Sequence, residues 1–285
     1  MPEHVGPIAL VFLRITGACI LFWLLSFISK SEKLEKGDLK KMALLALFGV
    51  FINQVFFIWG LSLTHPINSA IIMISNPIMV IVFTLIVVKD KITIIKISGL
   101  LLGIAGALTL MLFKGNFQFG SDTIAGDIMT LINAASWAVF VVMAKPFMQK
   151  YQTVTVMKWI FLFGFFYILP FGIKEMSITN WEGFSHPIDY SFPYFTIHGN
   201  VLISVCFVVI ATTFLAYLFN TYALKALSSE VVSMYIYLQP FLATLVAVMM
   251  GKDTLTPIKI LSGIFIIIGV YLVSFKKNVE FEIKN

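Results

Sequence analysis

Residues 71–88 read IIMISNPIMVIVFTLIVV, and only Ser75, Asn76 and Thr84 interrupt this apolar run with a polar side chain. Apolar and polar residues do not alternate along it, as they would in a strand of a membrane β-barrel. A helix that crosses a bilayer needs roughly 20 mostly apolar residues. We therefore predict that this segment is a membrane-spanning helix.

Similar apolar runs fill most of the chain. Of its 285 residues 59% are hydrophobic and only 12% are charged, with a mean hydropathy of +0.96, whereas soluble domains are about 25% charged. Such a chain lacks the polar surface that water requires, so its partner is the lipid bilayer. We predict an all-α integral membrane protein of about nine transmembrane helices, at residues 8–28, 42–63, 67–88, 93–113, 127–145, 156–173, 201–223, 231–250 and 258–275.

The placement of the lysines predicts the orientation of the chain. Fifteen lysines lie in alternate connecting segments, and the intervening segments hold four, which are Lys114, Lys174, Lys252 and Lys259. Positive charge marks the cytoplasmic side. We expect a multi-pass protein of the cell (inner) membrane with a cytoplasmic C-terminus and with Met1 outside. Because the net charge of +6 comes from these flanking lysines, we predict no nucleic-acid partner.

An internal repeat with an offset of 163 residues runs through the chain. A prolyl helix, a Lys-Asp-x-x-Thr turn and a glycine helix recur in the same order. The matched pairs are Asn76-Pro77 with Gln239-Pro240, Lys89-Asp90 with Lys252-Asp253, Thr93 with Thr256, Ser98-Gly99 with Ser262-Gly263 after a one-residue slip, and Gly106 with Gly269. Upstream, Phe56 and Trp59 match Phe219 and Tyr222.

The two copies of the repeat lie five spans apart, so they cross the membrane in opposite directions. Inverted repeats of this kind allow one structure to open alternately to each side of the membrane. We predict a first repeat at residues 1–113, a second at 127–275 and a cytoplasmic tail at 276–285. This architecture favours transport over anchoring or signalling.

The order and spacing of several short motifs resemble the drug/metabolite transporter superfamily, and within it proteins with two EamA-type domains. The motifs are Ala223-Leu224-Lys225-Ala226-Leu227-Ser228, Leu238-Gln239-Pro240, Gly251-Lys252-Asp253-x-Leu255-Thr256 and the helix from Ser262-Gly263 to Gly269-Val270. A weaker copy runs from Gly60-Leu61-Ser62-Leu63 through Pro77 to Gly106. The resemblance implies two five-helix halves that carry small organic metabolites such as amino acids, usually outward. Residues 1–7 resemble the loop after the family's first helix, so we expect that helix to be missing.

Polar side chains within the spans are the candidates for a substrate pocket, because an intramembrane polar group is costly unless it is paired or faces a cavity. Amides there would hydrogen-bond a polar substrate and aromatic rings would cover its apolar part. The alternative is hydrogen bonding between helices. The candidates are Asn53, Gln54, Asn133, Trp137, Tyr217, Asn220, Tyr235 and Gln239. Arg14 and Lys158 lie near span ends, where snorkelling to the interface is the favoured interpretation, with carboxylate binding by Arg14 as the alternative.

Prolines and glycines recur at equivalent places in both halves. Proline removes a backbone hydrogen bond and kinks a helix, so Pro77 and Pro240 are either gates or static bends. Small residues let helices approach closely. We expect such packing either between the two glycine helices or between the protomers of a homodimer, at Gly99, Gly103, Gly106, Gly263 and Gly269.

Several kinds of chemistry have no support in the sequence. No Asp or Glu lies in the middle of a span, no phosphate-binding Gly-rich loop appears, and the histidines lack metal-ligand spacing. We therefore predict no enzymatic activity, no cofactor and no metal. The favoured function is a secondary transporter, an exporter of small organic metabolites that works by alternating access. The alternative is a non-transporting or truncated membrane paralogue, either a sensor or an inactive component.

Overall fold

The computed structural model describes residues 5–29, 32–89, 93–112, 123–179, 185, 187–191, 196–251, 254 and 256–274. Within these residues nine helical segments are long and apolar enough to cross a membrane. The predicted number of spans is thus confirmed for the described part of the chain. Met1, residues 90–92, residues 252–253 and the tail 276–285, on which several predictions fell, lie outside it.

We number the spans one to nine in chain order. Four are single helices: α1 (Pro7–Ile28) is span 1, α6 (Ile94–Leu112) is span 4, α7 (Ile124–Lys150) is span 5 and α8 (Thr153–Ile178) is span 6. Span 9 is α13 (Pro257–Ser274), also a single helix. The other four are composite.

Each composite span changes its helical type part of the way across. Span 2 comprises α2 (Lys36–Ala46), a π-helical segment (Leu47–Ile52) and α3 (Asn53–Leu63). Span 3 comprises α4 (Pro66–Met73), α5 (Asn76–Phe83) and a π-helical end (Thr84–Val88). Span 7 comprises α9 (Val201–Phe207), a π-helical segment (Val208–Leu215) and α10 (Ala216–Ala226). Span 8 comprises α11 (Ser229–Met234), a 3₁₀ turn (Tyr235–Tyr237) and α12 (Leu238–Met249).

Local sequence explains several helix starts. Proline stands at the first turn of α1, α4 and α5, where its missing N–H would have no helical partner in any case. The side chains of Asn200 and Ser228 accept hydrogen bonds from the backbone N–H groups of Ile203 and Val231, which caps α9 and α11. The only strands in the described residues are β1 (Pro187–Ser191) and β2 (Thr196–Asn200), an antiparallel hairpin that leads into α9.

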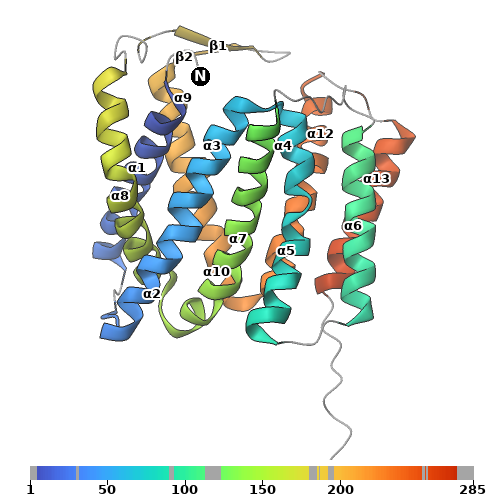
Figure 1. Ribbon diagram of the computed structural model, residues 1–285. Helices are drawn as coiled ribbons and strands as arrows, with labels where there is room; N and C mark the ends of the chain where they lie inside the picture. The colour runs from blue at the N-terminus through green and yellow to red at the C-terminus, as the bar shows by residue number, and fades with distance from the viewer. Residues whose placement is uncertain are drawn as a thin grey trace, which may run out of the picture.

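The two ends of the bundle differ in charge. One end carries the hairpin and the start of α1, and we call it the hairpin end (Figure 1). The other, the lysine-rich end, holds the start of α2, the α7–α8 junction and the start of α6 (Figure 1). Among the described lysines only Lys174 and Lys259 lie at the hairpin end. The lysines are therefore segregated as the sequence predicts, and orientation relative to the cytoplasm stays a prediction.

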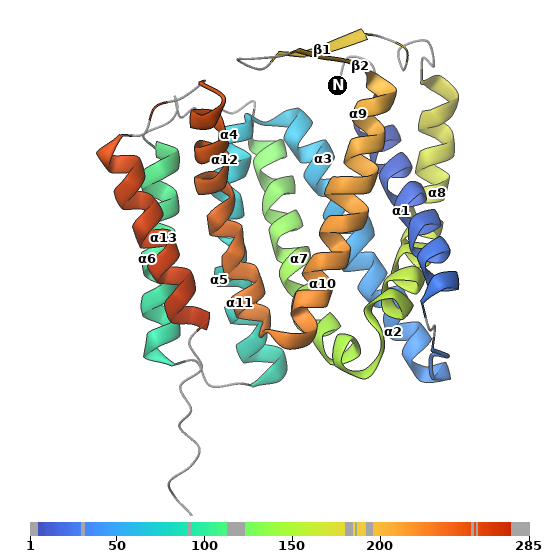
Figure 2. The ribbon, with the colours of Figure 1, turned by 180° about the vertical axis from the view of Figure 1, so that it is seen from behind.

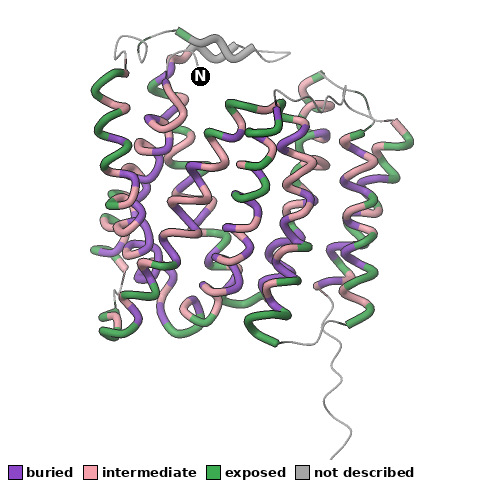
Figure 3. The backbone as a smooth tube through the Cα atoms, in the orientation of Figure 1, coloured by how far each residue is buried: buried purple, intermediate pink, exposed green. Residues whose placement is uncertain are grey.

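The helices pack in pairs that reflect the repeat. α1 packs on α8, α6 packs on α13, and α7 lies against α3 and α5. Seen from behind, span 7 lies in front of α3, span 8 in front of α4 and α5, and α13 in front of α6 (Figure 2). Exposed and buried residues alternate along each helix (Figure 3), and the exposed ones include large apolar side chains such as Phe27, at 80%, and Ile28, at 87%. Such a surface suits contact with lipid chains.

The contact between α6 and α13 is symmetric: when the two repeats are exchanged, the same pairs of positions touch. A Cβ atom added to Gly99 would lie 2.7 Å from the Gly269 carbonyl oxygen, and one added to Gly106 would lie 2.7 Å from the Ser262 carbonyl oxygen. The offset of 163 converts Gly99 into Ser262 and Gly106 into Gly269, so it exchanges one contact for the other. A two-fold axis produces this reciprocal pattern, and the two helices run in opposite directions (Figure 1).

This packing corrects the predicted register of the repeat. The one-residue slip would make Gly263 the equivalent of Gly99. In the structure Gly263 instead faces the ring of Phe241 in α12, and Ser262 occupies the place opposite Gly106. The unslipped offset therefore holds through the glycine helix, because helix faces are set by a constant number of residues per turn.

Candidate functional site

Two π-helical segments stand at equivalent positions in spans 2 and 7. Leu47–Ile52 shifted by 163 residues becomes 210–215, which lies within the second segment, Val208–Leu215. A π-helical turn widens the helix and leaves backbone groups available, and such turns are frequent at functional sites. Here they lie beside a group of polar side chains, all buried except for the half-buried Asn53, which we call the central polar cluster: Arg14, Asn53, Gln54, Asn133, Thr213 and Tyr217.

Tyr217 joins the two π-helical spans. Its hydroxyl oxygen lies 2.7 Å from the Gly49 carbonyl oxygen and 3.1 Å from Asn53 Oδ1. The Tyr217 side chain is 6% exposed, and the edges and faces of Trp137 and Phe161 surround its ring at centroid distances of 5.5 Å and 5.1 Å. The Tyr217 hydroxyl belongs to the second repeat. It can therefore donate to the Gly49 carbonyl oxygen, which lies in the π-helical segment of the first repeat.

Asn133 and Trp137 extend the cluster onto α7. The Asn133 amide nitrogen donates to the Asn53 carbonyl oxygen at 2.7 Å, while its own Oδ1 is buried and has no hydrogen-bonding partner in the described residues. Trp137 lies one turn away on the same face and packs on Tyr217. Both side chains thus contact span 2 or span 7, as helical spacing suggested.

Gln54 is the least satisfied member of the cluster. It is 2% exposed and interacts with Tyr217, but neither its amide oxygen nor its amide nitrogen makes a geometrically acceptable hydrogen bond within the described residues. Buried polar groups are nearly always hydrogen-bonded. An amide in the membrane interior whose oxygen and nitrogen both lack a hydrogen-bonding partner is a good candidate for contact with a polar ligand or water.

Arg14 does not behave as the favoured sequence interpretation predicts. Its side chain is 8% exposed and does not reach the end of the bundle. Instead Nε donates to Thr213 Oγ1 at 2.9 Å, and the guanidinium lies within electrostatic range of Tyr217. The snorkelling prediction is wrong for Arg14, because Thr213 in the π-helical segment of span 7 faces α1 and accepts a hydrogen bond from the Arg14 side chain. Lys158 is also 8% exposed, with Nζ 5.1 Å from the centre of the Trp23 ring, and snorkelling stays a prediction for this residue.

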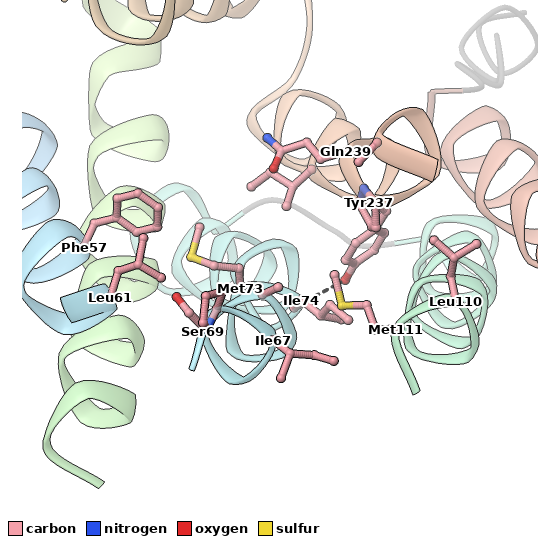
Figure 4. A pocket seen from close by; sticks show the side chains of 15 residues that line it. Phe57, Leu61, Ile67, Ser69, Met73, Ile74, Leu110, Met111, Tyr237 and Gln239 are labelled. Carbon is pink, nitrogen blue, oxygen red and sulfur yellow. Dashed lines mark hydrogen bonds between the residues drawn. The ribbon is translucent and has the colours of Figure 1, made fainter. Parts of the chain in front are cut away.

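A cavity of about 560 Å³ lies at the hairpin end, between α3, span 3, α6 and span 8. Its wall is mainly apolar, with Ser69, Tyr237 and Gln239 as polar members (Figure 4). Phe57 lines it one helical turn from Asn53, so span 2 connects the cavity to the cluster. The remaining lining residues come from α3, α4, α6 and span 8 (Figure 4).

Both predicted prolines stand directly after an interruption of the helix. The backbone tightens at Ile74–Ser75 before Pro77, and a 3₁₀ turn at Tyr235–Tyr237 precedes Pro240. The Tyr237 hydroxyl donates to the Ile74 carbonyl oxygen at 2.9 Å (Figure 4). These two residues are 163 positions apart, so the two broken helices meet at equivalent points. Pro240 lines the cavity and Pro77 is buried.

Trp137 packs on the cluster through Tyr217, but two other pocket candidates contact neither the cluster nor the cavity. Asn220 is exposed on α10, and Tyr235 is 48% exposed at the 3₁₀ turn of span 8. Residues three apart share a helix face, so helical spacing placed Asn220 near Tyr217, but in the structure only Tyr217 is buried and Asn220 is exposed.

The lysine-rich end is held together by an ion network that the sequence did not reveal. Asp38 in α2 is 5% exposed and accepts from Lys41 Nζ at 3.0 Å, Lys150 Nζ at 2.8 Å and the Tyr151 hydroxyl at 2.9 Å. Lys150 also pairs with Glu35 at 2.7 Å. The network joins span 2 of the first repeat to the end of α7 in the second. A second cavity, of about 540 Å³, lies at the same end beside Lys145 and Glu230.

Comparison with known proteins gives matches along the whole described fold. The model of the EamA-like transporter family matches residues 1–112 and 124–275. An uncharacterised transporter of Archaeoglobus fulgidus is 27% identical over 238 residues, which are 83% of this chain and 76% of that protein. The uncharacterised transporter YetK of Bacillus subtilis is 26% identical over 70% of this chain and 58% of its own length. A solved crystal structure that is 17% identical superposes with a TM-score of 0.73 over 95% of this chain and 88% of its own, which shows a common fold.

Proposed function

Because the chain belongs to the EamA-like transporter family, a family of multi-pass membrane transporters rather than enzymes, we propose that it exports small organic metabolites such as amino acids by alternating access. The observation that carries this proposal is the position of the central polar cluster. It lies between spans 2 and 7, which are equivalent helices of the two inverted repeats. A substrate bound there would contact both halves at once, and a rocking motion of one half against the other would expose it to either side.

The arrangement of contacts at the two ends supports the same proposal. At the hairpin end a cavity reaches from the surface to Phe57, one turn from Asn53. At the lysine-rich end Asp38 ties span 2 to the α7–α8 junction. An outward-open state of an alternating-access carrier would hold the span 2 side of the lysine-rich end together in this way, while the second cavity at that end lies between span 3, α7 and span 8. We propose that the lysine-rich end faces the cytoplasm, with the C-terminus there.

Transport is tested by reconstituting the full chain into proteoliposomes and measuring the flux of a panel of radiolabelled amino acids and other metabolites, with and without proton or sodium gradients. We expect saturable flux of at least one compound, reduced about tenfold or more by Tyr217→Ala. Phe27→Ala changes an exposed lipid-facing residue of α1 and serves as the matched control. Absence of flux for every compound would contradict the proposal and favour the non-transporting paralogue.

We further propose that Pro77 and Pro240 are hinges of the two prolyl helices. Each follows a broken turn, and the breaks contact each other through Tyr237 and Ile74. Replacing either proline by alanine restores an N–H and straightens the helix, so we expect slower exchange between outward-open and inward-open states. Pro170→Ala in α8, a proline within an unbroken helix, is the control. Equal flux in all three variants would show that the bends are static.

A further inference from the structure

Arg14 is a buried positive charge within a membrane span. It stands seven residues into α1, about 10 Å below the helix start at 1.5 Å per residue, and only 8% of its surface is exposed. Charged side chains at this depth pair with one another or face a functional cavity. The first question is therefore what neutralises Arg14.

No acidic side chain in the described part of the protein pairs with Arg14. Its partners in the described residues are the Thr213 hydroxyl, which accepts from Nε, and Tyr217 at longer, electrostatic range. Lys41, Lys96 and Lys150 form ion pairs with acidic side chains at the lysine-rich end, far from Arg14 in the chain. Both Nη groups thus have no partner in the described residues, although Nε is held in place.

Further unused polar groups lie around the same point. Arg14 and Gln54 both lie close enough to Tyr217 to affect it electrostatically, neither amide atom of Gln54 has a hydrogen-bonding partner in the described residues, and Asn133 Oδ1 is also unpaired there. All of these side chains are more than nine-tenths buried. A free guanidinium edge beside an amide with unused donors and acceptors is the composition of a binding site for a small charged group, and it is more than interhelical packing requires.

We propose that the two Nη groups of Arg14 bind the carboxylate of a monoanionic metabolite, with Gln54 and Asn133 hydrogen-bonding its other polar groups. The inference deepens the proposed transport function and rests on it, because it names the substrate class of the same cluster. The planar fork of a guanidinium matches a carboxylate through two parallel hydrogen bonds. Thr213 holds Nε at 2.9 Å, which leaves both Nη groups for the carboxylate.

The charge balance selects a carboxylate over a phosphate. The cluster holds one positive side chain in the described residues, and a carboxylate carries one negative charge, so the bound pair is neutral. A phosphate monoester carries between one and two negative charges at pH 7 and would leave an excess in the bundle. The same balance disfavours dicarboxylates.

Binding is tested on the purified full-length protein in detergent by thermal shift, which needs no transport. The probes are 2-oxo acids and short monocarboxylic acids, each compared with the carboxamide of the same compound and with inorganic phosphate. We expect at least one acid to bind at least tenfold more tightly than its amide, and phosphate not to bind. Arg14→Gln should abolish this preference, and Arg14→Lys should retain part of it. Lys158→Gln, which removes another buried positive charge outside the cluster, should preserve it.

A gain-of-stability variant covers the case in which Arg14→Gln does not fold. Thr213→Asp puts a carboxylate on the residue that Arg14 already contacts, with nearly the same volume. We expect a higher melting temperature than wild type and loss of acid binding, since the internal carboxylate occupies the site. The inference is overturned if no acid binds preferentially, if Arg14→Gln keeps the preference, or if Thr213→Asp lowers the melting temperature. Acid-selective binding without any flux in proteoliposomes would uphold this inference and contradict transport.

Discussion

The two prolyl helices, α5 and α12, come from equivalent places in the repeat but have different surroundings. The face of α5 formed by Asn76, Met79, Val80 and Phe83 packs on α7, and Asn76 and Val80 are fully buried. On α12 the equivalent positions are Gln239, Leu242, Ala243 and Val246. All four are exposed, with Leu242 and Val246 at 53% each.

The difference between α5 and α12 shows how a neighbouring helix, here α7, changes the role of a polar side chain. The Asn76 amide nitrogen donates to the Ala134 carbonyl oxygen of α7 at 2.9 Å, which fixes it. Gln239 has no helix of the described residues in the place that α7 takes, and it lines the cavity. The same type of side chain at the same repeat position is therefore structural in one half and available to a ligand in the other.

The largest loss of stability is expected at the glycine contact between α6 and α13, where the two halves are most alike. Gly99→Leu drives a side chain into the Gly269 backbone, which would already lie 2.7 Å from a Cβ atom. Backbone cannot yield as a side chain does, so we expect a loss of about 3 kcal/mol or more, seen as a large fall in melting temperature and in monodisperse yield. Gly37→Leu, where a Cβ atom meets nothing within 4 Å, is the control. A folded Gly99→Leu protein would mean that α6 and α13 can separate.

The next effect separates the two prolyl helices directly. Asn76→Ala removes the hydrogen bond to α7 and leaves a small void, and we expect a loss of about 2 kcal/mol in thermal unfolding. Gln239→Ala should change stability by less than about 0.5 kcal/mol and should instead raise the substrate concentration for half-maximal flux. The comparison fails if the two alanine variants are equally destabilised.

Much of the fold was predictable because it depends on composition and period. The nine spans follow from the length of apolar runs, and the repeat follows from ordered short motifs. Asn53, Gln54, Asn133, Trp137 and Tyr217 were predicted as pocket residues, and the structure brings these five together; their role in binding stays a proposal.

What the sequence did not predict depends on which face a neighbour covers. The sequence position of Arg14 predicts its depth in α1. It does not predict that the Thr213 hydroxyl lies opposite, because that pairing joins residues 199 positions apart. The π-helical segments contain no proline or other local signal. Asn220 carries the same polar signal as Asn133, and only packing makes one exposed and the other buried.

A smaller loss of stability is expected when tyrosine hydroxyl groups of the second repeat are removed. These hydroxyls donate hydrogen bonds to backbone carbonyl oxygens of the first repeat. Tyr217→Phe and Tyr237→Phe each remove one donor, to Gly49 and to Ile74 respectively. We expect each to cost about 1 kcal/mol and the double variant to cost about the sum, because the two sites share no partner. Tyr222→Phe, on an exposed residue of α10, should change nothing. Strong non-additivity in chemical or thermal unfolding would show that the two contacts move together.

The smallest effect is expected on the uncovered face of α12. Leu242 is 53% exposed, so Leu242→Ala removes few packing contacts and should change the melting temperature within experimental error, at most about 0.5 kcal/mol. Its equivalent in the first half, Met79, packs against Val80, Ala138 and Val142, and Met79→Ala should cost about 1–2 kcal/mol as those contacts are lost. Both variants are measured by thermal unfolding in the same detergent. An equal loss at the two positions would show that the α12 face is covered in the folded protein, and the distinction between a fixed Asn76 and an available Gln239 would then disappear.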